Sequence, residues 1–596
     1  MSLNFDEFNS VVEIFDKQSS TYKDKPYLWR KSSEKTGYEA LTWQEVRNKV
    51  ESFAAALKNI GILEGDRVVI VSENRPEWQI ADLAIMSIGA ITVPAYTTST
   101  SKDYEYIIQH SGARCVIVSN HELAKKVFPA VLKSQNCQNV IKFEKENEKY
   151  DFPVSVLNYL ELIQEFEKID LSDSISKLKR KDTACIIYTS GTGGNPKGVM
   201  LSHGAMLTNC NGAAHLLKEI LSSLDEIRIL SWLPLSHSYE HTLQFFKMGV
   251  GAQIYYAEGI DKLLINMSEA KPHIMTAVPR FYDSLHTRIS QGLKKQSKVS
   301  QFLFRETLRL GKKVYFNDNL SAYEKIMNNL MNKIVRKKVN KRFGGNLLAL
   351  VSGGAALNFE VGLYLSALGL PLLQGYGQTE TAPVVSANPP SKIKLDTVGT
   401  ILKGTKVKIA EDGEILVSGE NVMNGYWDDP EATSKTLVNG WIHTGDIGEI
   451  DDEGYLKITD RKKDIIVNAG GDNISPSRIE EKLNIEQEIA QSMMYGDFKN
   501  YLVAIIIPDR EFVKQWASDN KIKFDIDKII KNEDFIKTIK DTIERVNNKL
   551  STIEKVRKFL LINEEFTIEN DMMTPTLKVR RFKVKEKYKT ELEKLY

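Results

Sequence analysis

Along the first 120 residues, segments with helical signals alternate with short continuous apolar runs. This pattern predicts helices and strands in turn. Residues 41–61, LTWQEVRNKVESFAAALKNIG, begin with Thr42 and Glu45 in the spacing of a helix capping box and end at Gly61. The runs DRVVIVS, ITVPAY and CVIVS predict short buried strands, and RPEWQIADLAIMSIGA predicts a helix with Pro76 in its first turn. Strands that alternate with helices form mainly parallel sheets, so the pattern predicts an α/β fold.

The pattern changes twice further along the chain. A long helical stretch follows Pro279 and is rich in Lys and Arg up to KIVRKKVNKRFGG, after which NLLALVSGG and GLPLLQGYG predict strands again. From about Gly399 the short strands and tight turns of EDGEILVSGE and NGWIHTGDIGEIDDEGYLKITD predict a small antiparallel β unit.

Beyond DRKKD the sequence predicts a hairpin, a helix that opens at Ser475 and Pro476, the strand YLVAIIIPD and lysine-rich helices. We therefore expect a large N-terminal domain of parallel and mixed αβ sheets with a small β unit, and a small mobile α+β C-terminal domain. The expected boundaries are residues 1–460 for the large domain, with the β unit at about 399–460, residues 461–463 for a hinge, and residues 464–596 for the small domain.

The composition of the chain indicates which partners and which cellular compartment to expect. The 596 residues carry 80 basic and 78 acidic side chains, and this balance argues against a nucleic-acid partner. Four cysteines without a Cys-x-x-Cys pair are typical of reduced thiols in a cytosolic protein. The N-terminus has acids where a secretory signal has bases, and the two uncharged runs at 83–101 and 361–379 are interrupted by Gly and Pro. We expect a cytoplasmic protein.

A glycine-rich loop, YTSGTGGNPKG, is fed by a strand that begins at Ala184 and predicts a phosphate site. It is not the common phosphate loop, because Lys197 is followed by Gly198 and not by Ser or Thr. Lys197 adds a positive charge, and glycines allow close approach of backbone N–H groups to an anion. A glycine-rich surface turn is the alternative. The hydroxyl and glycine residues expected to take part are Thr189, Ser190, Gly191, Thr192 and Gly193.

Two further motifs carry groups suited to a nucleotide. In QGYGQTETAP, which follows an apolar strand, Tyr376 can stack on a base, Thr379 can bond a phosphate, and Glu380 is an oxygen ligand suited to magnesium. In WIHTGDIGEI we expect Asp446 in a tight turn between strands, where a carboxylate can hold two ribose hydroxyls. An ordinary polar turn and a turn-stabilising Asp are the alternatives.

The last two motifs lie near and beyond the expected hinge. In TDRKKDIIVNAGGDN, Arg461 can hold a ribose or a phosphate, and Gly470 and Gly471 allow close backbone approach in a hairpin. In MTPTLKVRR, Lys578 is followed by further bases. Taken alone, these are a charged hairpin and a solvated lysine.

Together, and in this order, the five motifs resemble those of the adenylate-forming superfamily of acyl-CoA synthetases, adenylation domains and luciferases. The resemblance covers roughly residues 42–578. Within the superfamily the chain looks most like a long-chain fatty acid–CoA ligase, on LPLSHSYEHTLQ, the basic helical region before LVSGGAAL, and the ending MTPTLKVRR. One departure is Gly193, which stands where the family loop usually has a second Thr, so pyrophosphate contact would rest on Thr189, Ser190, Thr192 and Lys197.

The resemblance implies two half-reactions that use ATP, Mg²⁺ and coenzyme A. A fatty acid carboxylate attacks the α-phosphate of ATP to give acyl-AMP and pyrophosphate, and CoA then takes the acyl group and releases AMP. Lys578 would bridge carboxylate and α-phosphate, Glu380 with Thr189 would hold magnesium, and His237 would line the carboxylate end; a packed core histidine is the alternative for His237. Tyr376 and the segment 353–356 would flank the adenine and the acyl entrance. The further residues expected to bind the cofactors in this region are Gly354, Ala355, Gln374, Gly375, Gly377 and Thr379.

The remaining expectations concern the ribose and the second half-reaction. Asp446 and Arg461 would fix the ribose. Rotation of the small domain at the hinge, where Lys463 lies, would replace Lys578 by the hairpin at Gly470 and Gly471, which would line a tunnel for pantetheine.

Three alternatives for function stay open at this point. The first is a fatty acyl-AMP ligase that loads a separate acyl carrier protein. The second is an acid–CoA ligase for a medium-chain or aromatic acid. The third is a nucleotide-binding regulatory protein without catalysis, against which the presence of both Glu380 and Lys578 argues.

The basic segment KIVRKKVNKRF also suggests weak, peripheral contact with an anionic membrane. At helical spacing four of its lysines, at positions 333, 337, 338 and 341, share much of one face, which Arg342 continues, with Ile334 and Val335 beside it. A solvated basic face and a site for the phosphates of CoA are the alternatives. The bases are Lys333, Arg336, Lys337, Lys338, Lys341 and Arg342.

Overall fold

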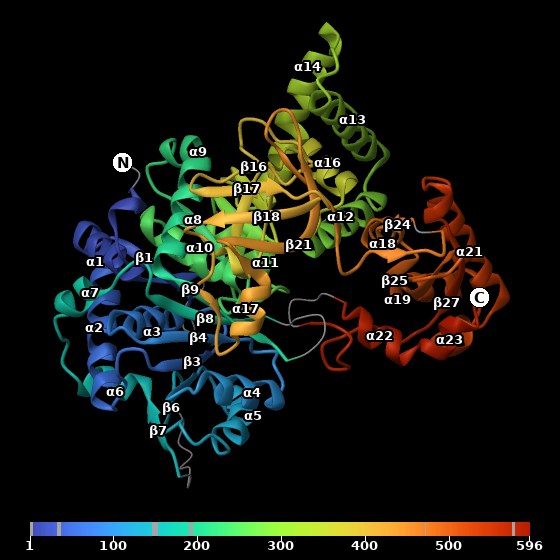
Figure 1. Ribbon diagram of the computed structural model, residues 1–596. Helices are drawn as coiled ribbons and strands as arrows, with labels where there is room; N and C mark the ends of the chain where they lie inside the picture. Colours follow the sequence, from blue (N-terminus) through green and yellow to red (C-terminus); the bar gives the residue numbers. More distant parts are fainter. Residues whose placement is uncertain (1–3, 33–36, 146–152, 190–194, 471, 575–578) are drawn as a thin grey trace.

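Two large sheets between layers of helices form the body of the protein (Figure 1). The computed structural model describes residues 4–32, 37–145, 153–189, 195–470, 472–574 and 579–596. In the described chain the first sheet has the order β19-β9-β8-β4-β3-β5-β6-β7. Its strands are β3 Arg67–Val71, β4 Ile91–Ala95, β5 Cys115–Val118, β6 Asn139–Lys142, β7 Ser155–Asn158, β8 Thr183–Thr189, β9 Lys197–Ser202 and β19 Gly425–Tyr426.

The second sheet has the order β16-β15-β14-β13-β12-β10-β11-β1-β2. The strands from β14 through β1 in this order pair in parallel, whereas the edge strands β15, β16 and β2 pair antiparallel. Its strands are β1 Pro26–Lys31, β2 Tyr38–Thr42, β10 Arg228–Ser231, β11 Gln253–Tyr256, β12 Ile274–Ala277, β13 Ala349–Ser352, β14 Leu372–Gly377, β15 Val384–Ala387 and β16 Thr400–Ile401.

Successive side chains of a buried strand point to opposite faces of the sheet, so each strand contributes to two hydrophobic cores. Val68 and Ile70 of β3 point into the core between the two sheets, and Val69 and Val71 point into the core on the outer face. The helices between the sheets are α1 Val11–Tyr22, α2 Trp43–Asn59, α3 Pro76–Ser87, α8 His203–Leu216 and α10 Ser238–Gly249. Those on the outer faces are α4 Ser101–Ser111 and α5 His121–Val131 on the first sheet, and α11 Leu263–Ala270, α12 Pro279–Lys294 and α16 Phe359–Ala367 on the second.

Several local predictions are confirmed in this body. Thr42 and Glu45 form the capping box of α2, and Pro76 is the first residue of α3. Each of the two uncharged runs begins in a buried helix and continues through a buried strand, α3 and β4 for the first and α16 and β14 for the second. In the described part of the chain, no helix has both the length and the apolar character needed to cross a bilayer.

A small antiparallel sheet follows the body, as the sequence predicts. It consists of β17 Thr405–Ile409, β18 Glu414–Gly419, β20 Leu437–Val438, β21 Trp441–Ile450 and β22 Leu456–Arg461, with α17 Pro430–Thr436 beside it. The expectation of a tight turn at Asp446 is wrong, because Asp446 lies inside the ten-residue strand β21 and pairs with Arg461 of β22.

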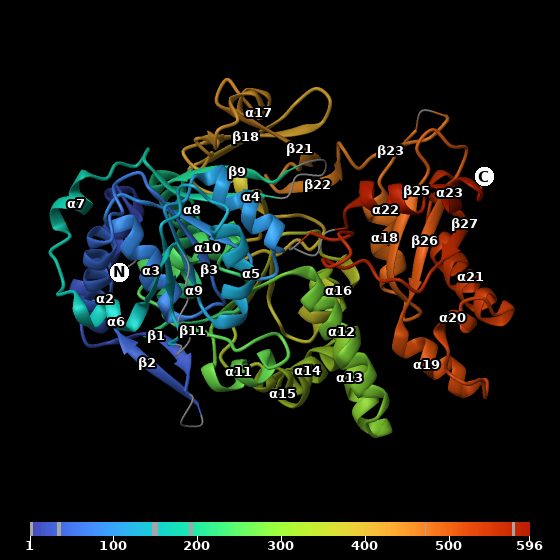
Figure 2. The same cartoon turned by 90° about the horizontal axis from the view of Figure 1, so that it is seen from below.

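The chain beyond residue 464 forms an α+β unit beside the body (Figures 1 and 2). Two hydrophobic clusters on the two faces of its three-stranded sheet hold it together, since β26 gives Ala504 and Ile506 to one and Val503 and Ile505 to the other. The fold class is confirmed. The elements are β23 Ile466–Val467, β24 Asn473–Ile474, α18 Pro476–Asn484, β25 Ile489–Tyr495, β26 Leu502–Pro508, α19 Arg510–Asp519, α21 Glu533–Asn547, β27 Val556–Leu561, α22 Arg581–Lys587 and α23 Lys589–Glu593.

A helical arm projects from the body at α13 and α14 (Figure 1). It consists of α13 Lys298–Tyr315, α14 Ala322–Met331, the π-helical turn η2 Asn332–Arg336 and α15 Lys337–Arg342. Arg336 does not share the exposed basic face of this arm. Its guanidinium turns inward and donates to the carbonyl oxygens of Ala367 at 2.8 Å and Thr307 at 3.2 Å.

Candidate active site

The predicted residues gather where β8 and β14 end, where α10 begins, and along β21 and β22. Ligands of α/β sheets bind at the carboxyl ends of strands, and loops there carry the functional side chains. Of the predicted residues, Ser190, Gly191, Thr192, Gly193, Gly471 and Lys578 lie outside the described residues.

The two ends of the predicted phosphate loop are held together as a β-ladder. Thr189, the last residue of β8, pairs with Lys197, the first residue of β9. The Lys197 ammonium lies 4.8 Å from the centroid of the Tyr426 ring, a cation–π distance. Tyr426 reaches this place because β19 pairs with β9, with Tyr426 opposite Val199. The ladder therefore sets where the loop begins and ends.

Glu380 lies in the one-turn helix η3 Thr379–Thr381, directly after β14. The Tyr426 hydroxyl donates a hydrogen bond of 2.9 Å to Glu380 Oε1. Burial first, and then the Glu380 carboxylate, raises the pKa of Tyr426, so the phenol remains a donor. Thr379 Oγ1 lies 3.0 Å from the hydroxyl of Ser238, the first residue of α10. Tyr426 thus links the predicted magnesium ligand to the predicted phosphate lysine.

Asp446 is the centre of a second set of contacts. Its Oδ2 accepts from the Tyr376 hydroxyl and from Gln378 Nε2, both at 2.7 Å, and its Oδ1 lies 3.3 Å from Arg461 Nε. Burial, followed by the Asp446 carboxylate, raises the pKa of Tyr376, which keeps that hydroxyl protonated. The carboxylate is buried while Arg461 is exposed. The contacts bring Tyr376, Asp446 and Arg461 together.

Other residues of the QGYGQTE motif have structural partners. The Gln374 side chain is committed to the backbone, since Leu357 N donates to it at 3.2 Å and it donates to Thr397 O at 2.9 Å. A Cβ on Gly377 would lie 1.7 Å from Pro383 O, and one on Gly375 would lie 3.2 Å from Ser386 O, so both glycines serve close backbone packing.

The turn after β13 and the start of α10 face each other. Gly354 adopts φ +84°, a conformation suited to glycine, and Ala355 follows it in the same turn. A Cβ on Gly353 would lie 3.2 Å from the Tyr239 ring. His237 is the N-cap of α10, is half-buried, and accepts from the Tyr239 backbone N–H through Nδ1 at 3.1 Å. This bond gives His237 a structural task at the edge of the site.

The predicted hinge begins at Arg461, the last residue of β22, and continues as a turn. Asp464 N donates to Arg461 O at 2.9 Å, and Lys463 is exposed between them. Lys462 fastens this turn to the small β sheet through Asp412 at 2.6 Å and Glu414 at 3.2 Å. Beyond it, Ile466 pairs with Ile474 in the predicted hairpin, where Gly470 is exposed.

The motifs did not predict four residues that contact the site: Ser238, Gln378, Tyr426 and Lys462. Gln378 lies inside the quoted motif QGYGQTE, and Lys462 lies inside DRKKD, so position within a motif was a signal for both. Tyr426, in the stretch NGYW, had no such signal, because the β19–β9 pairing joins strands far apart in sequence.

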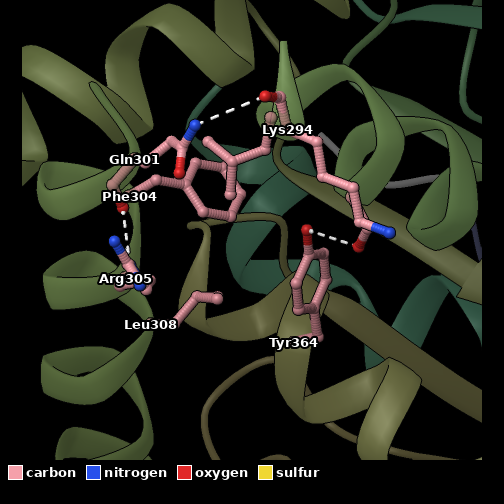
Figure 3. A pocket seen from close by; sticks show the side chains of 8 residues that line it. Lys294, Gln301, Phe304, Arg305, Leu308 and Tyr364 are labelled. Atoms are coloured by element: carbon pink, nitrogen blue, oxygen red, sulfur yellow. Dashed lines mark hydrogen bonds between the residues drawn. The ribbon is translucent and has the colours of Figure 1, made fainter. Parts of the chain in front are cut away.

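A cavity of about 300 Å³ lies elsewhere, between α12, α13 and α16 (Figure 3). Phe304, Leu308 and Tyr364 form apolar walls, with Lys294 and Arg305 also lining it. None of the predicted site residues that the structure describes lines this cavity.

Comparison with known proteins identifies the family. The AMP-binding enzyme family matches residues 15–427, and the C-terminal domain of AMP-binding enzymes matches residues 463–596. The chain belongs to the AMP-binding enzyme family. The resemblance stated from the sequence is therefore confirmed.

Relatives within this family share most of the chain. The long-chain-fatty-acid–CoA ligase FadD15 of Mycobacterium bovis is 30% identical over 93% of this chain and 92% of its own. The long-chain-fatty-acid–[acyl-carrier-protein] ligase AEE15 of Arabidopsis thaliana is 28% identical over 97% of this chain and 87% of its own. A crystal structure of the anthranilate CoA ligase AuaEII with anthranoyl-AMP has the same fold, with a TM-score of 0.72, 19% identity and 98% coverage of both chains.

The donor set of this AMP-binding enzyme fits a nucleotide with its metal ion. Magnesium is bound in proteins through one or two carboxylates together with substrate phosphates. Glu380 offers one carboxylate, of which Tyr426 occupies only Oε1 among the described contacts. Asp446 and Arg461 offer an acceptor and a donor side by side for a sugar.

Proposed function

We propose that this protein is an AMP-forming long-chain fatty acid–CoA ligase, which uses ATP, Mg²⁺ and coenzyme A and releases AMP and pyrophosphate. The observation that carries the proposal is that one motif supplies neighbouring residues to two groups of contacts. Gln378 bonds Asp446, and the next two residues, Thr379 and Glu380, bond Ser238 and Tyr426. Relatives named long-chain-fatty-acid–CoA ligase support the choice of acid.

In the first half-reaction, two anions must meet in one site. Lys197, at the start of β9, would neutralise the β- and γ-phosphates together with the loop hydroxyls. Glu380 and Thr189 would hold magnesium, which would supply positive charge for the departing pyrophosphate. Lys578 would lie between the fatty acid carboxylate and the α-phosphate. The loop thus holds the leaving group while the α-phosphate is attacked.

Asp446 and Arg461 would hold the nucleoside. Asp446 Oδ1 faces Arg461, so it can accept from a ribose hydroxyl while Oδ2 keeps Tyr376 and Gln378 in place. Tyr376 would flank the adenine, with residues 353–356 on the way to the acyl entrance. His237 would line the carboxylate end through the edge of its ring, since Nδ1 is used by the backbone.

In the second half-reaction we take residues 461–463 as the hinge and residues 464–596 as the moving domain. Lys462 forms ion pairs with Asp412 and Glu414 of the small β sheet. Among the described contacts, neither Lys463 nor the residues after it pair with these two acids. Rotation there would remove Lys578 and present the hairpin at Gly470 and Gly471 to pantetheine.

The main alternative is a fatty acyl-AMP ligase that loads a separate acyl carrier protein, the activity for which the relative AEE15 is named. A medium-chain or aromatic acid in place of a fatty acid is the other. The test is release of AMP with and without CoA. Release that depends on CoA supports the ligase proposed here, and release that depends on an added carrier protein favours the alternative.

Asp446→Ala is expected to raise the KM for ATP at least tenfold. The variant loses hydrogen bonds from ribose hydroxyls to a charged acceptor, each worth about 1.5–3 kcal/mol. Initial rates of pyrophosphate exchange at varied ATP would measure this. Asp452→Asn, in an exposed turn, is the control and should leave the KM unchanged. An unchanged KM in Asp446→Ala would remove the ribose role.

Tyr426→Phe is expected to raise the magnesium concentration for half-maximal activity about tenfold, because a hydrogen bond to a charged group contributes about 1.5–3 kcal/mol. The ring that faces Lys197 remains. Calorimetric titration of Mg²⁺ into the ATP-bound protein without fatty acid gives a second readout.

Tyr455→Phe is the matched control for this change, since its hydroxyl donates to Lys392 O at 2.8 Å away from Glu380. Equal shifts in both variants would show that loss of a buried hydroxyl, and not the contact with Glu380, causes the effect.

For the location of the protein we propose weak, reversible contact with an anionic membrane in addition to a cytoplasmic pool. A long-chain fatty acid partitions into bilayers, so a ligase that meets the bilayer surface meets its substrate there.

A further inference from the structure

Positive charge is concentrated in one part of the chain. Residues 279–343 hold sixteen Lys and Arg and four Asp and Glu, a net charge of +12, whereas the whole chain has a net charge of +2. The rest of the protein is therefore net negative. Such an asymmetric charge distribution orients a protein so that its basic part faces an anionic surface and its acidic part faces away.

Most of the bases at the end of this region remain without an acidic partner. Glu306 pairs with Arg309, and Glu324 pairs with both Arg309 and Lys313. The following bases are exposed and have no carboxylate partner among the described residues: Lys325, Lys333, Lys337, Lys338, Lys341 and Arg342. Their charge is available to an outside ligand.

An apolar stripe runs between these bases. Tyr323, Ile326, Leu330 and Ile334 are 66%, 71%, 42% and 45% exposed, and their spacing of three and four residues places them on one helix face. The stripe passes from α14 into η2. An exposed row of large apolar side chains with bases on both sides is typical of a helix that lies at a lipid interface.

The opposite face of the same helices is anchored, which fixes the stripe outward. Met331 is fully buried. Arg336 donates to Asn328 at 2.8 Å and Asn332 at 2.6 Å, as well as to the carbonyl oxygen of Ala367 at the end of α16. These bonds hold α14, η2 and α15 in one rotational setting against the body.

The bases of the arm are also spread over a length that suits contact with an extended surface. At 1.5 Å per residue, the bases from 325 to 342 spread over about 25 Å. That spread suits an array of phosphates, such as a layer of headgroups, better than one bound cofactor. Helices α11, α15, α14 and α13 lie along one edge of the molecule (Figure 2), and Ile265 of α11 is also exposed.

We propose that the face formed by α14, η2 and α15 docks on an anionic phospholipid surface. The stripe from Tyr323 to Ile334 lies among the headgroups, and the lysines of α15 contact lipid phosphates. Docking is reversible and does not insert a helix. Only the advantage of docking, which is delivery of a fatty acid from the bilayer to the enzyme, rests on the proposed function.

Co-sedimentation of the full chain with vesicles tests the docking. Vesicles of phosphatidylcholine with phosphatidylglycerol should bind the protein, and vesicles of phosphatidylcholine alone should bind it much less. Raising the salt from about 0.1 M to about 1 M shortens the Debye length from about 10 Å to about 3 Å and should release most of the protein. Binding that ignores both lipid charge and salt would overturn the proposal.

Two sets of variants locate the surface. Changing Lys337, Lys338 and Lys341 to Gln should weaken binding about a hundredfold, which corresponds to about 1 kcal/mol for each base. Ile326→Gln with Leu330→Gln should also weaken it, and the loss should persist at both salt concentrations. The controls are Lys102, Lys126 and Lys179 changed to Gln, and Leu63→Gln, which are exposed on other elements. Equal losses in the controls would overturn the assignment to this face.

Activity assays separate this inference from the proposed function. With fatty acid supplied as detergent-dispersed monomers, the variants should turn over like the wild type, and with acid supplied in anionic vesicles they should be slower. If the wild type makes no acyl-CoA from any acid, the proposed function fails while vesicle binding still decides the docking. A raised KM for CoA without a change in vesicle binding would assign the lysines to CoA phosphates and overturn the inference. So would a wild-type dimer that dissociates in the Ile326 and Leu330 variant without any vesicle binding.

Discussion

Lys578→Ala is expected to lower the rate of acyl-AMP formation about a thousandfold while sparing thioester formation from supplied acyl-AMP. A single positive charge at about 4 Å from an anion contributes on the order of 4 kcal/mol at an effective dielectric constant near 20. At about 1.4 kcal/mol per factor of ten, that is roughly a thousandfold in rate. Pyrophosphate exchange measures the first half-reaction, and release of acyl-CoA from synthetic acyl-AMP measures the second.

The flanking structure offers a control for this variant. Lys583, in the next helix, is a nearby lysine that lies 3.6 Å from Asp571, so Lys583→Ala should change neither half-reaction more than severalfold. The described residues that precede and follow positions 575–578 are joined by the bridge between Met573 and Val579 and by the bond from Arg580 N to Met572 O. Normal acyl-AMP formation in Lys578→Ala would contradict the assignment.

Lys463→Pro is expected to slow the transfer of the acyl group to CoA about a hundredfold and to slow adenylation much less. The bond from Asp464 N to Arg461 O closes a turn in which Lys463 is the third residue, a position where proline distorts the common turn type. Proline also restricts Lys462, the residue that is fastened to the β sheet. Small misplacement of reacting groups can cost about a hundredfold in rate. Single-turnover measurement of each half-reaction would show the split.

Lys463→Ala separates the hinge from the charge of the side chain. It keeps the backbone free and should leave both half-reactions near the wild-type rate. Equal losses of both half-reactions in Lys463→Pro, accompanied by a lower melting temperature, would indicate misfolding and would remove the support for a hinge at this residue.

The sequence predicted those parts of the fold that depend on local signals. The capping box at Thr42 and the helix start at Pro76 depend on residues that are close in sequence, and both are confirmed. The buried strands around Val69 alternate between two cores, so their apolar runs were sufficient to place them.

The parts that were missed depend on pairing between distant segments. Asp446 was expected in a turn because Thr-Gly-Asp is typical of turns, but the ladder with β22 extends the strand through it. The inward direction of the Arg336 guanidinium depends on the π-helical turn and on the carbonyl oxygen of Ala367 at the end of α16, a segment distant in sequence. Tyr426 came to Glu380 through a two-residue strand that no periodicity reveals.

The central claim is tested most directly by measuring AMP release for a series of acids from acetate to oleate, with and without CoA. The proposed function predicts AMP and acyl-CoA in equal amounts, only when CoA is present, and the largest kcat/KM for the long-chain acids. AMP release that needs a carrier protein, or no pyrophosphate exchange with any acid, would contradict it.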